Sequence, residues 1–310
     1  MGKKKYWNII KLLLKLGFTA LLGYLVFQKI DFHQVKTVFL QSNPAYIIAA
    51  FVAYFSSQVI SSWRLLGFLH SIKLPVRFGF NFKLYLLGMF YNVFLPGGVG
   101  GDGYKIYLLR KKFRLPTKNI LFALLLDRVS GVWAISFLAV VLTLFLPSFP
   151  TRVWWPVIVV AATLLYYLVY KLYFSSFLQN FFVAHGKAIL VQSLQLAAVT
   201  FILLSQNFKE GFPLYLFCFL LSSLATIIPI SIGGLGIREY VIVQAAAYFS
   251  MDTALAVFMT LCFYIISTLS ALTGVWFVYR SKEFEPMPDE KQVKAIEDDA
   301  EKVALHQHNF

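Results

Sequence analysis

The stretch LPGGVGGDGYKIYLLRKK, residues Leu95–Lys112, interrupts an apolar sequence and decides how the fold is predicted. The apolar run LYLLGMFYNVF leads into it, and a proline, five glycines, an aspartate and a cluster of bases follow. Backbone outside a helix is tolerated at membrane depth only where protein surrounds it or where it lines a polar cavity. The stretch therefore predicts a broken membrane helix with a polar group held beside the break.

The composition places the chain among membrane proteins. Of its 310 residues, 59% are hydrophobic and 14% are charged, and the mean hydropathy is +0.71. These values lie outside the usage of soluble domains. The formal net charge is +14, and the bases lie beside apolar runs. The expected partners are therefore the membrane bilayer and its anionic phospholipid, and no nucleic acid.

Six apolar runs approach or exceed the roughly 20 residues that cross a hydrocarbon core. They are Trp7–Gln28, Pro44–Ser62, Ile120–Leu146, Val153–Tyr173, Ala188–Ser205 and Ala254–Tyr279. Two further segments, Leu84–Tyr104 and Leu214–Phe249, contain a proline and a glycine-rich turn and predict re-entrant hairpins; two full crossings are the alternative for the second. The predicted fold class is all-α, a polytopic helical bundle of about six transmembrane helices and two hairpins, eight membrane elements.

The basic residues predict the orientation of this bundle. With both hairpins in place, fifteen lysines and arginines fall on one side and five on the other. Because basic loops stay in the cytoplasm, both termini are expected there, in a multi-pass protein of the cell (inner) membrane. The transmembrane domain is expected at residues 1–279, and residues 280–310 are expected to form a polar cytoplasmic tail.

The two glycine-rich turns resemble each other. Leu95-Pro96-x-x-x-Gly100-Gly101-x-Gly103-x-Lys105 aligns with Ile228-Pro229-x-x-x-Gly233-Gly234-x-Gly236-x-Arg238. The same offset superimposes the run that begins at Ile120 on the run that ends at Tyr279. This predicts an inverted repeat with halves of about 1–146 and 147–279, a plan that recurs in transporters. A chance match among membrane glycines is the alternative.

Each glycine turn is a candidate anion site. Glycines let a ligand approach peptide NH groups, and a helix N-terminus that follows them favours phosphate or carboxylate. Lys105 and Arg238 each lie two residues beyond the last glycine of their turn. The alternative is that the glycines only permit tight turns and close helix packing. The ligand-lining candidates are Gly100, Gly101, Gly103, Gly233, Gly234 and Gly236.

Charges inside the membrane runs are the second set of candidates, because each is costly in hydrocarbon unless it is paired or hydrated. Asp127 is expected to meet Lys105 or Arg238. Arg128 is expected to meet Asp102, Glu239 or a lipid phosphate, or else to reach the interface. Arg64 either points inward or anchors the membrane boundary. Together four cations face three carboxylates, and the surplus positive charge would suit a monoanionic headgroup.

No catalytic, cofactor or metal motif is present in the sequence, so none of these groups is expected. The stretches FLPGGVGGDGYKIYLLRK, LLLDRVSG and IPISIGGLGIREYV, in that order, resemble the lysylphosphatidylglycerol synthase transmembrane-region family. The resemblance covers about Trp7–Tyr279 and implies a flippase-like membrane protein. It also marks eleven positions as functional: Gly100, Gly101, Asp102, Asp127, Arg128, Gly131, Gly233, Gly234, Gly236, Arg238 and Glu239.

The residues and the resemblance together predict a lipid translocase. An anionic phospholipid or a polyprenyl phosphate would bind by its headgroup between the two hairpins, and Asp127 and Glu239 are candidate proton carriers. The tail after Tyr279 is too short for a synthase domain, so phosphatidylglycerol lysyltransferase activity is not expected. The alternatives are a membrane subunit or enzyme that handles a lipid-linked substrate with a partner synthase or glycosyltransferase, and a purely structural partner.

Overall fold

The structure is a computed structural model that describes residues 37, 40–94, 100–113, 116–146, 154–227 and 236–279. All regular secondary structure within these ranges is helical. The helices are α3 (Pro44–Ser71), α4 (Phe78–Phe94), α5 (Gly100–Phe113), α6 (Thr117–Thr143), α7 (Trp154–Tyr173), the 3₁₀ helix η1 (Ser175–Asn180), α8 (Phe181–Leu204), α9 (Phe212–Ala225), α10 (Ile237–Tyr248), α11 (Thr253–Leu272) and α12 (Val275–Tyr279). The predicted all-α class is confirmed for the described part of the chain.

Within the described ranges, five helical segments are long and apolar enough to cross a membrane. They are α3, α6, α7, η1 with α8, and α11 with the start of α12. Each overlaps one of the predicted runs, although α3 continues past Ser62 to Ser71 and the segment of η1 with α8 begins at Ser175, well before the predicted Ala188. The sixth predicted run, Trp7–Gln28, lies outside the described residues. The chain is therefore a multi-pass membrane protein.

Local chemistry explains where several helices begin. The side-chain oxygen of Asn43 accepts a hydrogen bond from the Ala45 NH at 3.0 Å, and Asp252 does the same for the Leu255 NH at 3.1 Å. Such caps satisfy NH groups that have no partner within their own helix. Before α10, Gly236 has a φ of 86°, which an L side chain rarely adopts. The chain can therefore turn sharply into α10 at this glycine.

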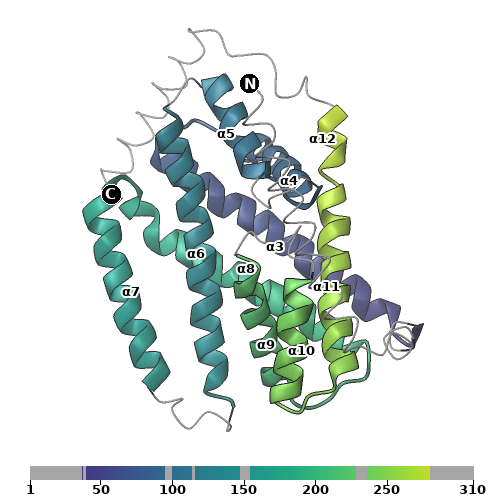
Figure 1. The fold of residues 1–310 in the computed structure, drawn as a ribbon. Coiled ribbons are helices and arrows are strands. Elements are labelled where there is room, and N and C mark those ends of the chain that lie inside the picture. The colour runs from purple at the N-terminus through teal and green to yellow at the C-terminus, as the bar shows by residue number, and fades with distance from the viewer. Residues whose placement is uncertain are drawn as a thin grey trace, which may run out of the picture.

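The helices of the two predicted halves occupy equivalent places. Shifted by the 133 residues that separate the two glycine motifs, α3 overlaps α8, α4 overlaps α9, α5 overlaps α10 and α6 overlaps α11. The contacts between helices also correspond when the two halves are interchanged. α6 packs on α9 as α11 packs on α4, and α4 pairs with α5 as α9 pairs with α10. The equivalent helices α3 and α8 pack along each other. Figure 1 shows α4 and α5 towards one end of the molecule and α9 and α10 towards the other, with α6 and α11 running in opposite directions.

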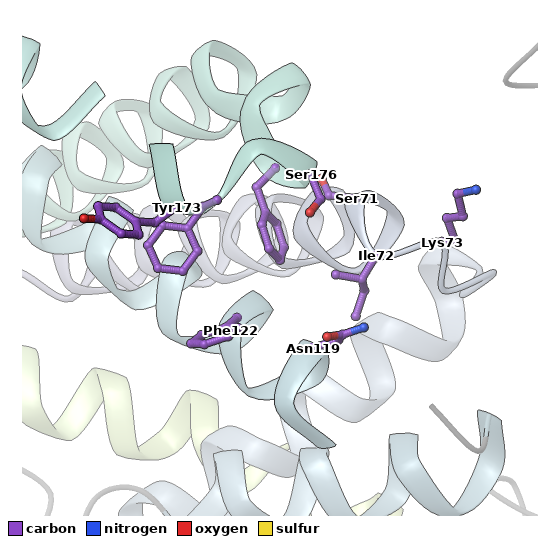
Figure 2. Close-up of a pocket in the computed structure, with 9 residues that line it drawn as sticks. Ser71, Ile72, Lys73, Asn119, Phe122, Tyr173 and Ser176 are labelled. Atoms are coloured by element: carbon purple, nitrogen blue, oxygen red, sulfur yellow. The ribbon is translucent and has the colours of Figure 1, made fainter. Parts of the chain in front are cut away.

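Within the described part of the chain, one end of the molecule carries most of the basic residues, and we call it the basic end. It contains the last turns of α3, α5 and α7, the first turns of α4 and α6, and η1. Its core is a cluster of buried side chains that includes Phe68, Leu69, Leu109, Tyr170 and Phe177. A cavity of about 380 Å³ opens beside this core, between the ends of α3, α6 and α7 and η1 (Figure 2). The basic residues of the basic end are Lys73, Arg77, Lys83, Arg110, Lys111, Lys112, Lys118 and Lys171.

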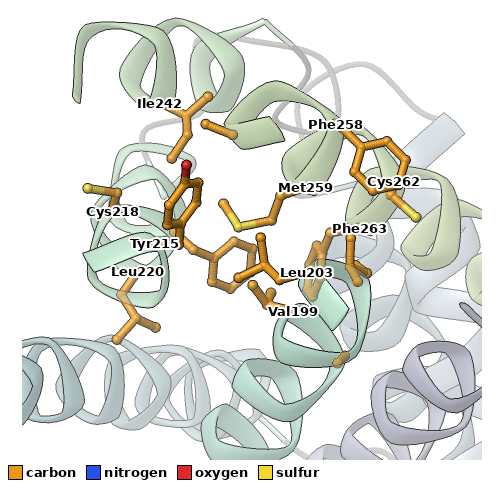
Figure 3. Close-up of a cluster of buried hydrophobic side chains, with 14 of the residues drawn as sticks. Val199, Leu203, Tyr215, Cys218, Leu220, Ile242, Phe258, Met259, Cys262 and Phe263 are labelled. Atoms are coloured by element: carbon orange, nitrogen blue, oxygen red, sulfur yellow. The ribbon is translucent and has the colours of Figure 1, made fainter. Parts of the chain in front are cut away.

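The opposite end has its own core, formed mainly by α8, α9, α10 and α11. Figure 3 shows side chains from these helices meeting, among them Leu203, Cys218, Met259 and Phe263. Both cysteines of the chain, Cys218 and Cys262, are buried here as free thiols. The cores at the two ends leave between them a region where α3, α4, α5 and α6 meet through polar side chains.

Two glycines permit backbones to touch inside this bundle. A Cβ on Gly101 would lie 2.0 Å from the carbonyl oxygen of Gly88, so α5 rests directly on α4. A Cβ on Gly274 would lie 2.1 Å from the carbonyl oxygen of Leu86, so the end of α11 rests on the same helix. Close approach of this kind is a common use of small residues in membrane proteins. For Gly101 the geometry therefore favours the packing alternative over a ligand-lining role.

We predict that Gly101→Ala destabilises the protein by about 1–3 kcal/mol, the usual cost of overpacking a close contact. Gly103→Ala, on the same helix, is the matched control, because a Cβ at Gly103 would meet nothing within 4 Å. Replacing this exposed helical glycine by alanine is expected to be neutral or to stabilise α5 by up to about 1 kcal/mol. Thermal unfolding of the two purified variants in detergent measures the difference. Equal midpoints would contradict the close contact between α4 and α5.

Candidate functional site

A cluster of charged side chains lies where α3, α5 and α6 meet. Its five members are Arg64 of α3, Asp102 and Lys105 of α5, and Asp127 and Arg128 of α6. We call it the ion-pair cluster. All except Arg128 are buried, with at most 8% of each residue exposed. Because charges are costly inside a membrane bundle, such a group is a functional-site candidate.

Arg64 and Asp127 form the inner pair of the ion-pair cluster. The Nε of Arg64 donates to Oδ1 of Asp127 at 2.7 Å, and the two side chains are 7% and 12% exposed. The Nη1 of Arg64 is also buried and has no hydrogen-bond partner. A Cβ on Gly131, one turn further along α6, would lie 3.6 Å from this nitrogen. The inner pair therefore retains a buried NH group that can still donate.

The other three members of the ion-pair cluster form an outer group, with Asp102 between Lys105 and Arg128. Asp102 accepts from Lys105 Nζ at 3.2 Å and from Arg128 Nε at 2.5 Å. The Arg128 side chain is 45% exposed, whereas the Asp102 side chain is 11% exposed. The Lys105 ammonium also lies 4.7 Å from the ring centroid of Tyr85. Arg128 is therefore the member of the cluster that a ligand from outside can reach first.

Polar side chains continue from the ion-pair cluster along the buried face of α3. Tyr54, Gln58, Ser61 and Arg64 are all buried, and their spacing of three or four residues places them on one side of the helix. Tyr85 of α4 donates from its hydroxyl group to Oε1 of Gln58 at 3.3 Å. We call this row the α3 polar stripe. It carries hydrogen-bonding groups from the ion-pair cluster towards the opposite end.

Nearby polar contacts join α3, α4 and α5 around this stripe. The Asn81 amide donates to the Ser62 carbonyl at 2.6 Å and to its hydroxyl oxygen at 3.0 Å. The Asn92 side-chain oxygen accepts from the Gly101 NH at 2.9 Å, at the start of α5. These side chains satisfy backbone groups that no membrane lipid could satisfy.

Arg238 lies near the far end of the α3 polar stripe. Its guanidinium is 5.4 Å from the Phe219 ring and 5.1 Å from the Phe263 ring, distances typical of cation–π contacts. The Phe263 ring in turn meets the Tyr54 ring edge-on at 5.2 Å. Glu239 is buried at 3% exposure and accepts from the Gly236 NH at 2.8 Å, closing the first turn of α10. Its second oxygen, Oε1, has no hydrogen-bond partner.

The structure corrects the pairing expected for Asp127. That carboxylate meets Arg64, and neither Lys105 nor Arg238, because α3 and α6 lie against each other and bring Arg64 to it. The expected contact between Arg128 and Asp102 is confirmed, and Arg64 points inward. The Lys105 side chain passes over Gly88 and bonds to Asp102. The turn at 95–99, beside which a glycine cradle was predicted, lies outside the described residues.

The predicted glycine cradles are only partly described. Gly100 is the first residue of α5, and Gly103 is exposed. The NH groups of Gly101 and Gly236 are already bonded to protein side chains. Gly233 and Gly234 lie outside the described residues. Among the described residues, no three His, Cys, Asp or Glu side chains gather as a metal site requires.

The α3 polar stripe was not predicted from the sequence. Its signal is present in the sequence, because Gln58, Ser61 and Arg64 recur at helical spacing within an apolar run. The contribution of Tyr85 and Asn81 from α4 could not be read this way, since it depends on how two helices pack.

We predict that Arg64→Met destabilises the protein by about 3–5 kcal/mol, because it leaves the Asp127 carboxylate buried without its partner. The double variant Arg64→Met with Asp127→Asn removes both charges, and its unfolding midpoint is expected to recover most of the loss. A double-mutant cycle measured by thermal unfolding gives the coupling. If the two substitutions were simply additive, the pair would not be the structural unit described above.

The sequence model of the lysylphosphatidylglycerol synthase TM region matches residues 12–188, which is more than half of the chain. This match includes all five residues of the ion-pair cluster, whereas Arg238 and Glu239 lie beyond it. No curated protein matches the chain significantly. The family fits a membrane, lipid-related role. From the match and from a helical bundle with five apolar helices of membrane-spanning length, the chain belongs to the lysylphosphatidylglycerol synthase TM region family.

Proposed function

We propose that this protein is a flippase-like lipid translocase of the cell inner membrane. It binds the headgroup of an anionic phospholipid or of a polyprenyl phosphate at the ion-pair cluster and passes it along the α3 polar stripe. The lipid chains stay in the bilayer while the headgroup moves through the protein. The observation that carries this proposal is the row of polar groups that leads from the exposed Arg128 through the buried ion-pair cluster and the α3 polar stripe to Tyr54. The Tyr54 ring contacts the Phe263 ring, over which Arg238 lies.

The charge of the ion-pair cluster favours an anion. Three cations, Arg64, Lys105 and Arg128, face two carboxylates, Asp102 and Asp127, so the cluster has a net charge of +1. A monoanionic phosphodiester neutralises this surplus. Arginine is well suited to the task because its planar guanidinium can donate two hydrogen bonds to one phosphate. The half-exposed Arg128 receives the phosphate first, and the unpaired Nη1 of Arg64 offers a second donor.

The lengths of four helices support the two re-entrant hairpins. α4, α5, α9 and α10 have 17, 14, 14 and 12 residues, which at 1.5 Å per residue gives about 18–26 Å. Each is shorter than a hydrocarbon core of about 30 Å. α4 packs against α5, and α9 packs against α10, as the two arms of a hairpin do. The connecting turns at 95–99 and 228–235 lie outside the described residues.

The exchange of contacts between the two sets of helices supports an inverted repeat. Transporters with such repeats open alternately to the two sides by moving one half against the other around a central site. Here the two halves meet along α3 and α8, and the α3 polar stripe runs beside that contact. In the proposed cycle, movement between α3 and α8 changes which end of the stripe is open.

We predict that Arg128→Ala slows headgroup movement by about tenfold to a hundredfold, the effect of losing a charge-assisted hydrogen bond worth about 1.5–3 kcal/mol. The measurement uses the full chain reconstituted in vesicles with fluorescent phosphatidylglycerol or a labelled polyprenyl phosphate. A membrane-impermeant quencher reports which headgroups have crossed.

Arg110→Ala is the matched control for this experiment. It removes an arginine from the exposed last turn of α5 and leaves the ion-pair cluster intact. Its rate is expected to equal that of the unchanged protein. Protein that binds these lipids but moves none of them would contradict the translocase and favour a subunit that presents lipid to a partner synthase.

The proposed orientation has its own prediction. Lys171→Cys at the basic end is expected to react with an impermeant maleimide only from the cytoplasmic side, because basic ends of membrane proteins stay inside. Lys209→Cys at the opposite end is expected to react only from outside. Both positions are exposed lysines, and the two native cysteines are buried. Labelling of both positions from one side would contradict the proposed orientation of the bundle.

A further inference from the structure

The cavity at the basic end lies outside the ion-pair cluster, and the proposed function does not use it. Asn119, which lines it, precedes Asp127 by eight residues on α6, a separation of about 12 Å along the helix axis. Figure 2 shows Asn119 opposite Ile72, with Phe122 and Tyr173 to one side and Lys73 at the other edge. The volume of this cavity, about 380 Å³, is in the range of small-molecule sites.

The lining of this cavity combines donors with aromatic walls. Ser71, Lys73, Asn119 and Ser176 supply polar side chains. The Tyr173 hydroxyl points away from the cavity (Figure 2). The Phe122 and Phe174 rings meet edge-on at 5.5 Å and form an apolar wall. A site of this kind fixes a polar group by a few contacts while its walls exclude water.

Among the described residues, the charges around the cavity have one sign. Lys73 lies at its edge, and the Lys118 ammonium lies 5.7 Å from the ring centroid of Phe122. Of the five described carboxylates, Asp102 and Asp127 are held in the ion-pair cluster. The other three, Glu210, Glu239 and Asp252, belong to the opposite end. An anionic group is therefore favoured here over a cationic or neutral one.

The surface beside the cavity suits lipid chains. α7 ends at the cavity, and in this helix only Tyr170 is buried. Its other side chains are at least partly exposed, and the exposed apolar ones include Val157, Leu164, Leu168 and Leu172. Twenty residues of helix extend about 30 Å, which matches the thickness of a hydrocarbon core. A ligand with its headgroup in the cavity can lay its chains along α7.

We propose that this cavity is a second lipid site, which binds the phosphate of an anionic lipid between Lys73 and Asn119 while the acyl chains lie on α7. Lys73 and Lys118 supply the positive charge, and the Asn119 amide donates to a phosphate oxygen. The site is separate from the ion-pair cluster. Lipid bound here needs no translocation, so the proposal does not depend on the proposed function.

The experiment isolates this site by working in the Arg128→Ala background, where the ion-pair cluster has lost its accessible cation. Because a ligand that binds only the folded protein raises its unfolding temperature, titration with dioctanoyl phosphatidylglycerol in detergent reports binding. We expect a saturable rise in the background protein. Adding Asn119→Trp, which fills the cavity without changing the charge, is expected to raise the apparent Kd at least tenfold. Lys73→Gln is expected to raise it severalfold.

Lys209→Gln is the matched control, because it removes an exposed lysine from the opposite end. It is expected to leave the apparent Kd unchanged. Dioctanoyl phosphatidylcholine and inorganic phosphate complete the comparison. An equal rise with phosphatidylcholine would show a general lipid coat and overturn the proposal, and an equal affinity for inorganic phosphate would assign the site to a soluble anion.

Binding that survives both Asn119→Trp and Lys73→Gln would also overturn the second site. If the tryptophan variant does not fold, Lys73→Gln decides alone, since Lys73 is exposed in the connection between α3 and α4. The vesicle assay with Arg128→Ala tests headgroup movement and does not depend on lipid binding at this cavity. A failure of the translocase and a failure of this site therefore give different results.

Discussion

The pairing of Asp127 with Arg64 is the constraint on which the interior of this protein depends. A carboxylate in the middle of an apolar helix is tolerated only with a partner, and this partner comes from a helix 63 residues earlier in the chain. The pair therefore specifies how α3 and α6 are placed relative to each other. α5 adds Asp102, which brings Lys105 and Arg128 into the same group. Three helices are thus held in register by charges that lipid could not solvate.

The close backbone contacts make this arrangement possible. Gly101 lets α5 approach α4, and Gly88 leaves room for the Lys105 side chain to cross α4 towards Asp102. Without these two glycines, the helix pair would separate and Lys105 would lose its path to the carboxylate. Packing and electrostatics are therefore coupled in this region, and the glycines serve the ion pairs by setting the distance between helices.

Composition and periodicity were enough to predict the helical class and the five described membrane-spanning segments, because hydropathy over about 20 residues is a strong signal. The contact between Arg128 and Asp102 could be predicted because few carboxylates lie within or beside the apolar runs. The partner of Asp127 could not be derived in this way, since Lys105, Arg238 and Arg64 are equally acceptable by charge and only the packing of α3 on α6 selects among them. The turns that hold Gly97 and Gly233 lie outside the described residues, so the hairpins stay a prediction.

The two halves share an arrangement of helices but not their charges. The positions that correspond to Arg64 and Asp127 are Ala197 and Thr260, so the second half has no equivalent of the inner pair. A carrier whose halves were chemically identical would rest with equal preference for its two open forms. Here the inner pair lies within the first half alone, so the interiors of the two halves differ chemically. In the proposed translocase, the two open forms are therefore not equivalent, and the empty protein is expected to populate them unequally.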